Sequence, residues 1–341
     1  MVKLKPNFKG AEGAISLLKR IRSGESTPGQ GEIKMVFESD EYKYMCEHHM
    51  VVKSGEISKL DPEDLADIIG SIRKGQALSP DRDEKILKIR DSFASSLEGV
   101  ENIEKALLNI KGSSIEEVEK GINSYFPEDF QGEYDIIFIL DGYDGFYIHN
   151  GKLVVDLYTI AQWKDIRRSL ANCLFKFVLK GLVRTWSQDF SLDSYLLSRR
   201  ILSVLGLSGV LAHYFSSDDI KSPSESDEPL IFNLLVYFKD VEHMLVRILD
   251  KNLIEREWKK NFFILFYDSE SGYSVGDEMA KVVIGKLGEG EFIGALKNPF
   301  GFLDVYNGLA KEINRGRKEY HYCFNDSVVE RLMALSASGG G

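Results

Sequence analysis

The chain has 341 residues, of which 43% are hydrophobic and 28% are charged. It is therefore long enough to bury a large core, either as one big domain or as two of ordinary size. Its 43 basic and 53 acidic side chains give a formal net charge of −10. Because the basic residues form no stripe with interleaved aromatic residues, this composition argues against a nucleic-acid partner.

The cysteines and the apolar runs indicate the cellular compartment of the protein. Cys46, Cys173 and Cys323 are odd in number and far apart, so they predict neither a disulfide framework nor a metal knuckle. The N-terminal residues lack the apolar core of a signal peptide. The most apolar run, Leu230–Phe238, is about half as long as a membrane span. We therefore expect a cytoplasmic protein with no membrane partner.

The first 130 residues predict a string of helices that carry no chemistry. The clearest start is Asp61-Pro62-Glu63-Asp64, with an N-cap, a proline in the first turn and acidic residues at the positive end of the helix dipole. Ser114-Ile115-Glu116-Glu117 predicts a capping box for another helix. The expected helices are Ala11–Ile21, Asp61–Lys74, Asp83–Leu97, Val100–Ile110 and Ser114–Tyr125.

Composition changes at Phe130, where runs of β-branched and aromatic residues begin. These runs predict three short antiparallel strands in meander order, and a two-residue type I′ turn at Asn150-Gly151 joins the last two. The strands are Tyr134–Leu140, Phe146–His149 and Lys152–Leu157. The intervening Asp141–Gly145 resembles part of a calcium loop, but it lacks the later glutamate and the flanking helices. It is better interpreted as a strand turn.

Helices return after these strands. An exposed loop, Ser216–Glu228, separates the second from the third, and Ser336–Gly341 is expected to be a flexible tail. The expected helices are Ile160–Val183, Leu192–Phe215, Pro229–Asp250, Val275–Leu287, Glu289–Leu296 and Phe302–Asn314.

Six short motifs stand out along this order of strands and helices. They are Val155-Asp156-Leu157, Leu170-Ala171-Asn172-Cys173-Leu174-Phe175-Lys176, Leu207-Ser208-Gly209-Val210-Leu211-Ala212, the segment Gly272–Ala280, Pro299-Phe300 and Tyr306-Asn307. With them the chain resembles a family of predicted zinc-dependent peptidases known mostly from bacterial and archaeal genomes. The resemblance implies a thermolysin-like core, in which a small antiparallel sheet is followed by two long helices.

The resemblance also assigns positions to the zinc chemistry. In such enzymes two histidines one helical turn apart bind zinc, a glutamate between them acts as the general base, and a second helix adds a carboxylate. The matching positions here are Asn172, Cys173, Lys176 and Ser208. Asn172 is a weak ligand, protonated Lys176 repels a dication, and Ser208 carries no charge. We therefore expect no catalytic residue, no metal and no cofactor at this place.

The other candidate residues do not rebuild a site. No ligand at helical spacing follows His48-His49, and the remaining histidines stand alone. Tyr273 matches a family tyrosine that could assist a tetrahedral intermediate, but without a metal it lines a pocket at most. Cys173 and Lys176 share one helical face, and a nearby ammonium group can activate a thiol. No histidine partner is evident, so a small buried side chain beside a lysine is the favoured interpretation.

These patterns predict an α+β protein that is predominantly α-helical. A helical lead-in of residues 1–129 precedes a degenerate peptidase-like core of residues 130–335 and a tail of residues 336–341, and we expect the lead-in and the core to pack as one compact unit. The leading hypothesis is a catalytically inactive peptidase homologue that binds a peptide, protein or small molecule in the remnant cleft. The cleft residues are Asn172, Cys173, Lys176, Ser208 and Tyr273. The alternatives are an enzyme with Cys173 as its nucleophile and a purely structural or oligomeric module.

Overall fold

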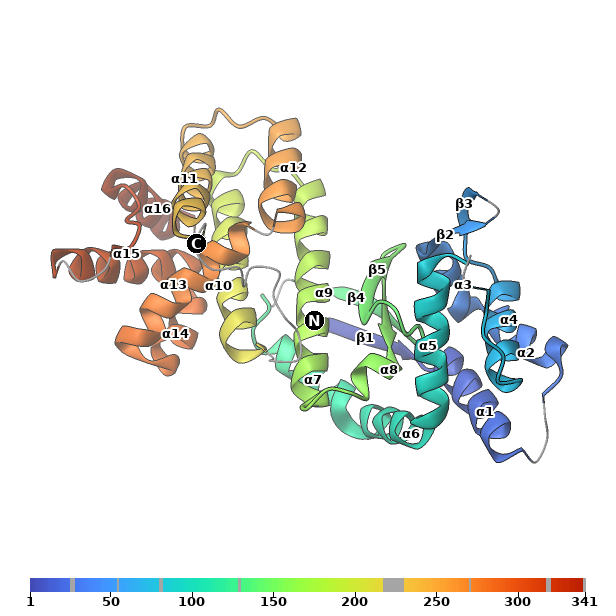
Figure 1. The fold of residues 1–341 in the computed structure, drawn as a ribbon. Coiled ribbons are helices and arrows are strands. Elements are labelled where there is room, and N and C mark those ends of the chain that lie inside the picture. The colour runs from blue at the N-terminus through green and yellow to red at the C-terminus, as the bar shows by residue number, and fades with distance from the viewer. Residues whose placement is uncertain are drawn as a thin grey trace. The chain divides into compact units, whose positions relative to one another are not determined.

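The structure is a computed structural model that describes residues 1–24, 28–53, 55–79, 82–127, 130–216, 230–269, 271–316 and 320–339. The chain is mostly helical with a small sheet, as predicted (Figure 1). It forms two compact units: unit 1 is Met1–Ser124 with Gln131–Cys173, and unit 2 is Tyr125–Phe130 with Leu174–Gly341. The main division thus falls inside a long helix and not at residue 129, because the N-terminal strand shares a sheet with residues 132–156.

Unit 1 is built on a four-stranded mixed sheet in the order β1-β4-β6-β5. Strand β1 (Val2–Asn7) pairs in parallel with β4 (Gly132–Ile139), and β4 pairs in parallel with β6 (Lys152–Asp156). Only β5 (Phe146–His149) is antiparallel, to β6. The predicted antiparallel meander is therefore wrong: β5 lies at an edge, and β4 and β6 are direct neighbours.

Burial explains this order. Ile136–Ile139 of β4 and Leu153–Val155 of β6 are buried at every residue, as expected for central parallel strands that are covered on both faces. At the edge, β1 alternates buried Val2 and Leu4 with exposed Lys3 and Lys5. Helices α1 (Lys9–Ser23) and α3 (Asp40–His48) pack on β4, and α7 (Ile115–Asn123) packs on β1.

The remaining helices of unit 1 follow the predictions in part. Helices α4 (Pro62–Arg73), α5 (Glu84–Glu98) and α6 (Val100–Asn109) were expected, and the Asp61 carboxylate caps α4 by accepting from the backbone N–H of Asp64 at 2.9 Å. Ser114 makes no capping hydrogen bond, because it is itself helical at the end of a π-helical turn, η1 (Ile110–Ser114). The elements that were not predicted include β1, α2 (Gln30–Phe37), α3 and the hairpin of β2 (Met50–Lys53) with β3 (Glu56–Lys59).

The helix predicted for Ile160–Val183 begins six residues later, at Ile166, and a separate short helix precedes it. The short α8 (Leu157–Ile160) begins at Asp156, and α9 (Ile166–Gln188) begins after Asp165. The Asp165 carboxylate accepts a hydrogen bond from the backbone N–H of Arg168 at 3.0 Å. This is the geometry of an N-cap, which marks a new start and separates the two helices.

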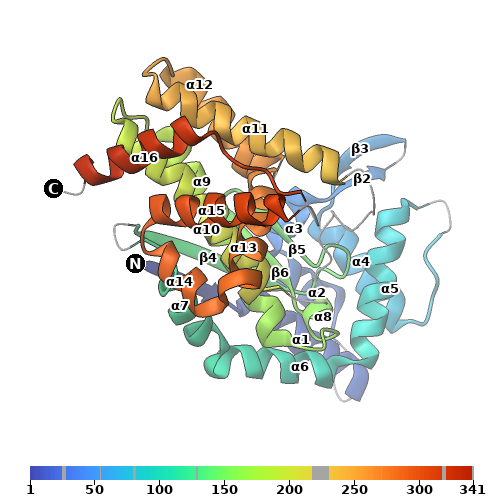
Figure 2. The same ribbon diagram turned by 90° about the vertical axis from the view of Figure 1, so that its left-hand side faces the viewer.

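Unit 2 is helical in the part of the chain that the structure describes. Helix α10 (Ser194–Tyr214) packs against α11 (Leu230–Leu249), α13 (Ser271–Leu287), α15 (Pro299–Arg315) and α16 (Asp326–Gly339), and α11 and α16 lie side by side (Figure 2). Helices α12 (Glu255–Phe263) and α14 (Glu289–Leu296), a π-helical turn, η2 (Ile264–Asp268), and the part of α9 from Leu174 onward also belong to it. Residues 336–339, in the segment expected to be a flexible tail, belong to α16. Residues 217–228 of the predicted loop and residues 340–341 lie outside the described residues.

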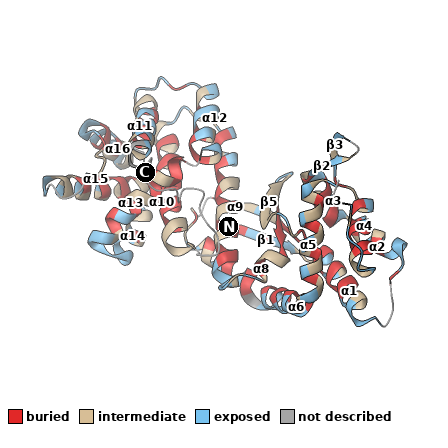
Figure 3. Ribbon diagram, viewed as in Figure 1, coloured by how far each residue is buried: buried red, intermediate tan, exposed pale blue. Residues whose placement is uncertain are grey.

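Helix α10 is the core helix of unit 2. Every residue from Ile201 to Val210 is buried (Figure 3). Among the described helices it alone is long and apolar enough to cross a membrane, and 67% of its apolar window is buried inside the protein. Burial by neighbouring helices accounts for its composition, because a helix that is apolar on all sides belongs in a core as readily as in a bilayer.

Candidate functional site

Three of the five predicted cleft residues lie on α9. Cys173 is 1% exposed, while Asn172 and Lys176 are partly exposed. Asn172 and Lys176 are four residues apart, so they share one face of the helix. The thiol of Cys173 is enclosed, and such burial keeps it away from dissolved reagents. The division between the two units falls directly after Cys173.

Ser208 on α10 is the residue at which the resemblance led us to expect the third zinc ligand. It is 2% exposed, and its hydroxyl donates to the backbone carbonyl of Val204 at 2.6 Å. Opposite it stands Gly276 of α13, where an added Cβ would lie 2.7 Å from the Ser208 Cβ and 2.2 Å from the Leu205 carbonyl oxygen. The two helices therefore cross in close contact at Ser208, and a longer side chain has no room there.

Tyr273 joins Ser208 at the same helix pair. It is 9% exposed and lies three residues before Gly276 on α13, so both residues are on one face of that helix. Within unit 2, the structure thus brings Ser208 and Tyr273 to the α10–α13 contact.

A surface groove of unit 2 lies elsewhere. It has a volume of about 650 Å³ and follows α12 and η2 beyond the end of α9. Its lining is largely basic and apolar, and includes Arg256, Lys259, Lys260 and Phe263. None of the five predicted cleft residues lines it.

A different group of polar side chains gathers in unit 1, at the carboxyl ends of parallel strands. Asp156 ends β6 and pairs in register with Ile139 of β4, and Asp141 follows β4. Because adjacent parallel strands end at the same edge of a sheet, the two aspartates meet there. The backbone N–H of Asp141 donates to Oδ1 of Asp156 at 2.9 Å.

Two consecutive histidines reach this edge from α3. His48 is the last residue of the helix, and His49 has an extended backbone with φ −87° and ψ 117°. The chain turns there from helix into β2. The change of backbone conformation lets both imidazoles face the loop that follows β4, where they meet Asp141 and Asp144.

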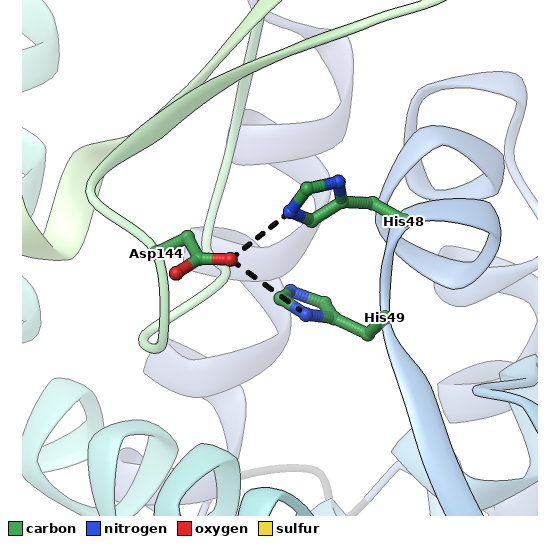
Figure 4. Close-up of side chains that lie close together, drawn as sticks. All are labelled: His48, His49 and Asp144. Carbon is green, nitrogen blue, oxygen red and sulfur yellow. Dashed lines mark hydrogen bonds and ion pairs between the residues drawn. The ribbon is translucent and has the colours of Figure 1, made fainter. Parts of the chain in front are cut away.

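His49 is fully buried and lies between two carboxylates. Its Nε2 is 2.9 Å from both carboxylate oxygens of Asp141. On the other side of the ring, Nδ1 is 3.9 Å from Oδ2 of Asp144, and Figure 4 shows this pair. A carboxylate only accepts, so Nε2 carries the hydrogen that it donates to Asp141. In the neutral ring Nδ1 then has its lone pair directed toward Asp144. This Nδ1 makes no hydrogen bond with any residue that the structure describes.

His48 stands at the outer side of the same cluster. Its Nε2 lies 3.0 Å from Oδ2 of Asp144, and its ring stacks on Tyr147 with 3.7 Å between centroids. Partial burial lowers the pKa of His48 although the Asp144 carboxylate acts against this, so the neutral imidazole is favoured at pH 7. One ligand atom from each of His48, His49 and Asp144 lies within 4.8 Å of the other two. These three side chains could share a metal ion.

Asp156 anchors the inner side of this edge. Its carboxylate accepts from the backbone N–H groups of Asp141, Tyr158 and Thr159 and from the Thr159 hydroxyl. Burial, and next the charge of Asp141, raise the pKa of Asp156 to about 6 from an ordinary value of 3.8. The folded protein thus holds this proton more tightly than the unfolded chain does.

The free energy of unfolding should therefore fall as the pH rises from about 4 to about 6. The folded-state pKa lies above the unfolded one, so the contribution of Asp156 is complete below the unfolded pKa and is lost through pH 6, by roughly 3 kcal/mol. Urea unfolding between pH 4 and 7 in the presence of EDTA measures this. Asp156→Asn should flatten the pH dependence, and the exposed Asp91→Asn should not. Equal slopes for wild type and Asp156→Asn would contradict the assignment.

The parts of this cluster lie far apart along the chain, so the sequence alone does not join them. His49 and Asp141 are 92 residues apart, and His48 and Asp144 are 96 apart. The one local signal was an aspartate after each of two apolar strands, Asp141 and Asp156. Direct pairing of β4 with β6 brings them together, whereas the predicted meander placed β5 between the two strands and kept the aspartates two strands apart.

Residues 218–315 match the model of a family described as "Putative zinc dependent peptidase (DUF5700)". This range lies in unit 2 and is compatible with a peptidase-like protein. It includes Tyr273 and the Gly272–Ala280, Pro299-Phe300 and Tyr306-Asn307 motifs, and it begins after Ser208 and the three α9 positions. No curated protein and no solved structure matches the chain.

Proposed function

We propose that this chain is a peptidase homologue that does not hydrolyse peptides through zinc on α9 and α10. Instead, it binds a peptide with Lys176 of α9 and Tyr273 of α13. The observation that carries the proposal is the environment of Ser208. Its hydroxyl bonds to its own helix and its Cβ abuts α13, so neither a charge nor space for a third zinc ligand is present. The family match over residues 218–315 supports the peptidase-like ancestry.

The chemistry of Lys176 and Tyr273 favours a ligand that carries a carboxylate. Lys176 is partly exposed on α9, and an ammonium group binds carboxylates through charge-assisted hydrogen bonds. An acidic side chain or the C-terminus of a peptide supplies such a group. Tyr273, nearly buried on α13, adds an aromatic surface with one polar end.

The first arm of the test separates this proposal from zinc catalysis. Asn172→Ala with Ser208→Ala should leave both the zinc content per chain and any release of fluorescence from a quenched casein substrate at the wild-type level. Metal analysis and the hydrolysis assay are run on the same samples. Zinc or hydrolysis that disappears in this double variant would overturn the claim of inactivity.

The second arm tests binding with fluorescein-labelled peptides that end in a free carboxylate. Lys176→Gln should weaken binding at least about tenfold, because a hydrogen bond to a charged group contributes roughly 1.5–3 kcal/mol. Fluorescence anisotropy reports the affinity, and Lys180→Gln, one turn further along α9, is the matched control. Peptides that do not bind, or that bind equally well to Lys176→Gln, would rule out this mode of recognition.

A further inference from the structure

We propose that His48, His49 and Asp144 of unit 1 form a binding site for a divalent transition-metal ion, with zinc as the ion that these ligands fit best. This site is distinct from the peptidase positions on α9 and α10, and it stands whether or not those helices bind a peptide. It uses two imidazole nitrogens, one carboxylate oxygen and a position open to solvent.

The distances fit a shared ion. Zinc binds imidazole nitrogen and carboxylate oxygen at about 2.0–2.2 Å, which separates two ligand atoms of a tetrahedral site by about 3.3 Å. The Asp144 Oδ2 atom is 3.0 Å from Nε2 of His48 and 3.9 Å from Nδ1 of His49. These values lie on either side of the tetrahedral spacing, so modest side-chain rotations would bring the three atoms around one ion.

His49 supplies the observation that points to a ligand. The ring is fully buried, and its Nδ1 has no hydrogen-bond partner among the residues that the structure describes. In the neutral ring this nitrogen is an acceptor, and it faces Oδ2 of Asp144 at 3.9 Å, on the side on which His48 also lies. A buried acceptor without a donor is unfavourable, and another acceptor, the Asp144 carboxylate, cannot satisfy it. A cation placed between the two atoms satisfies both.

Contacts with neighbouring residues orient the two histidine ligands. Metal-binding histidines commonly donate their other ring N–H to a carboxylate, which fixes the tautomer and the ring plane. Asp141 does this for His49 through Nε2, and the backbone N–H of Tyr143 donates to Asp141 Oδ1 at 3.2 Å. For His48, stacking on Tyr147 holds the ring within 7° of parallel. The imidazoles are thus oriented before any ion arrives.

The outer side of the cluster gives an ion access. The side chains of His48 and Asp144 are 29% and 37% exposed, while that of His49 is fully buried. Three protein ligands with one side open to water is the arrangement in which zinc retains a water molecule. Calcium and magnesium prefer oxygen ligands, so the two imidazoles favour zinc or a neighbouring transition metal.

The experiment titrates ZnCl₂ into the EDTA-treated full-length protein in competition with a chromophoric chelator. One zinc per chain is expected. His48→Ala and Asp144→Asn, both at partly exposed positions, should weaken binding at least tenfold, and Asp141→Asn should weaken it about 10–100-fold through the orientation of His49. His321→Ala is the matched control, because it removes a similar histidine–carboxylate pair, 3.0 Å from Glu278, in unit 2.

Thermal unfolding in EDTA confirms that the variants fold, and CoCl₂ gives a second readout. Cobalt bound by imidazoles should produce visible absorption bands that are lost in His48→Ala and kept in His321→Ala. Wild-type protein that takes no stoichiometric zinc from the chelator would overturn the site. So would zinc affinity unchanged in both His48→Ala and Asp144→Asn. Zinc lost only in Asn172→Ala with Ser208→Ala would instead place the ion on α9 and α10.

Discussion

Replacing Gly276 by alanine should lower the free energy of unfolding by about 1–3 kcal/mol, the usual range for an overpacked core. The added Cβ would lie 2.2 Å from the Leu205 carbonyl oxygen and 2.7 Å from the Ser208 Cβ. A backbone oxygen cannot rotate away as the end of a side chain can. Relief therefore requires α10 and α13 to move apart along a contact that both helices bury. Urea unfolding followed by circular dichroism measures the change.

Gly285→Ala is the matched control for this substitution. Gly285 lies on the same helix, is exposed, and would have no neighbouring atom within 4 Å of an added Cβ. Its replacement should raise the free energy of unfolding by roughly 0.5–1 kcal/mol, because alanine restricts the unfolded chain more than glycine does. If the two glycine-to-alanine substitutions on α13 change the free energy of unfolding in opposite directions, the close helix crossing at Gly276 is the cause. A shared sign would show that the close approach at Gly276 is absent.

Ser208→Glu should destabilise the protein still more, by about 3–5 kcal/mol, the range for an uncompensated buried charge. The substitution restores the carboxylate that the peptidase pattern places on the second helix. Because Ser208 is 2% exposed and faces Gly276, the larger side chain must either ionise inside the α10–α13 contact or force it open. Thermal unfolding with and without ZnCl₂ measures both possibilities.

Ser208→Ala is the control that tests the loss of the hydroxyl without introducing a larger side chain. It removes the hydrogen bond to Val204 and should change the free energy of unfolding by no more than about 1 kcal/mol. Ser208→Glu protein that is as stable as wild type, or that zinc stabilises, would mean that this position opens into a metal-binding cleft. The proposal of an inactive peptidase homologue would then fail at its central observation.

Local signals predicted the elements whose causes are local. Asn150-Gly151 adopts positive φ values of 50° and 77°, as a type I′ turn requires, and β5 has the predicted bounds. The Asp61 carboxylate caps α4. Each of these features depends on contacts within a few residues, so the sequence around it contains the whole cause.

Features that depend on distant partners were missed or misplaced. The first four residues of β1 alternate between buried and exposed, but the strand that pairs with them begins at Gly132, and a short strand with two lysines carries a weak local signal. The order of β4, β5 and β6 followed from which strands are buried on both faces, which local patterns do not reveal. The break between α8 and α9 depended on Asp165, whose capping role was overlooked.

The same contrast between local sequence signals and distant contacts applies to the candidate sites. The peptidase resemblance named Ser208 and Tyr273, which the structure places on one helix pair, but it could not show that Gly276 closes the space beside Ser208. The histidine cluster could be recognised only from the tertiary structure. Its residues were visible, but only the parallel sheet and the turn at the end of α3 bring them together.

The pairing of β1 with β4 also determines the order in which unit 1 can assemble. Val2 is in register with Gly132, so the sheet joins segments separated by the whole helical lead-in. Closing so long a loop is entropically unfavourable, and contacts between distant segments slow folding. The edge that carries Asp141 and Asp156 pairs locally, through β4 and β6, but the contact of His49 with Asp141 joins segments 92 residues apart. The histidine ligands should therefore reach this edge late in folding, after the strands that carry the aspartates have paired.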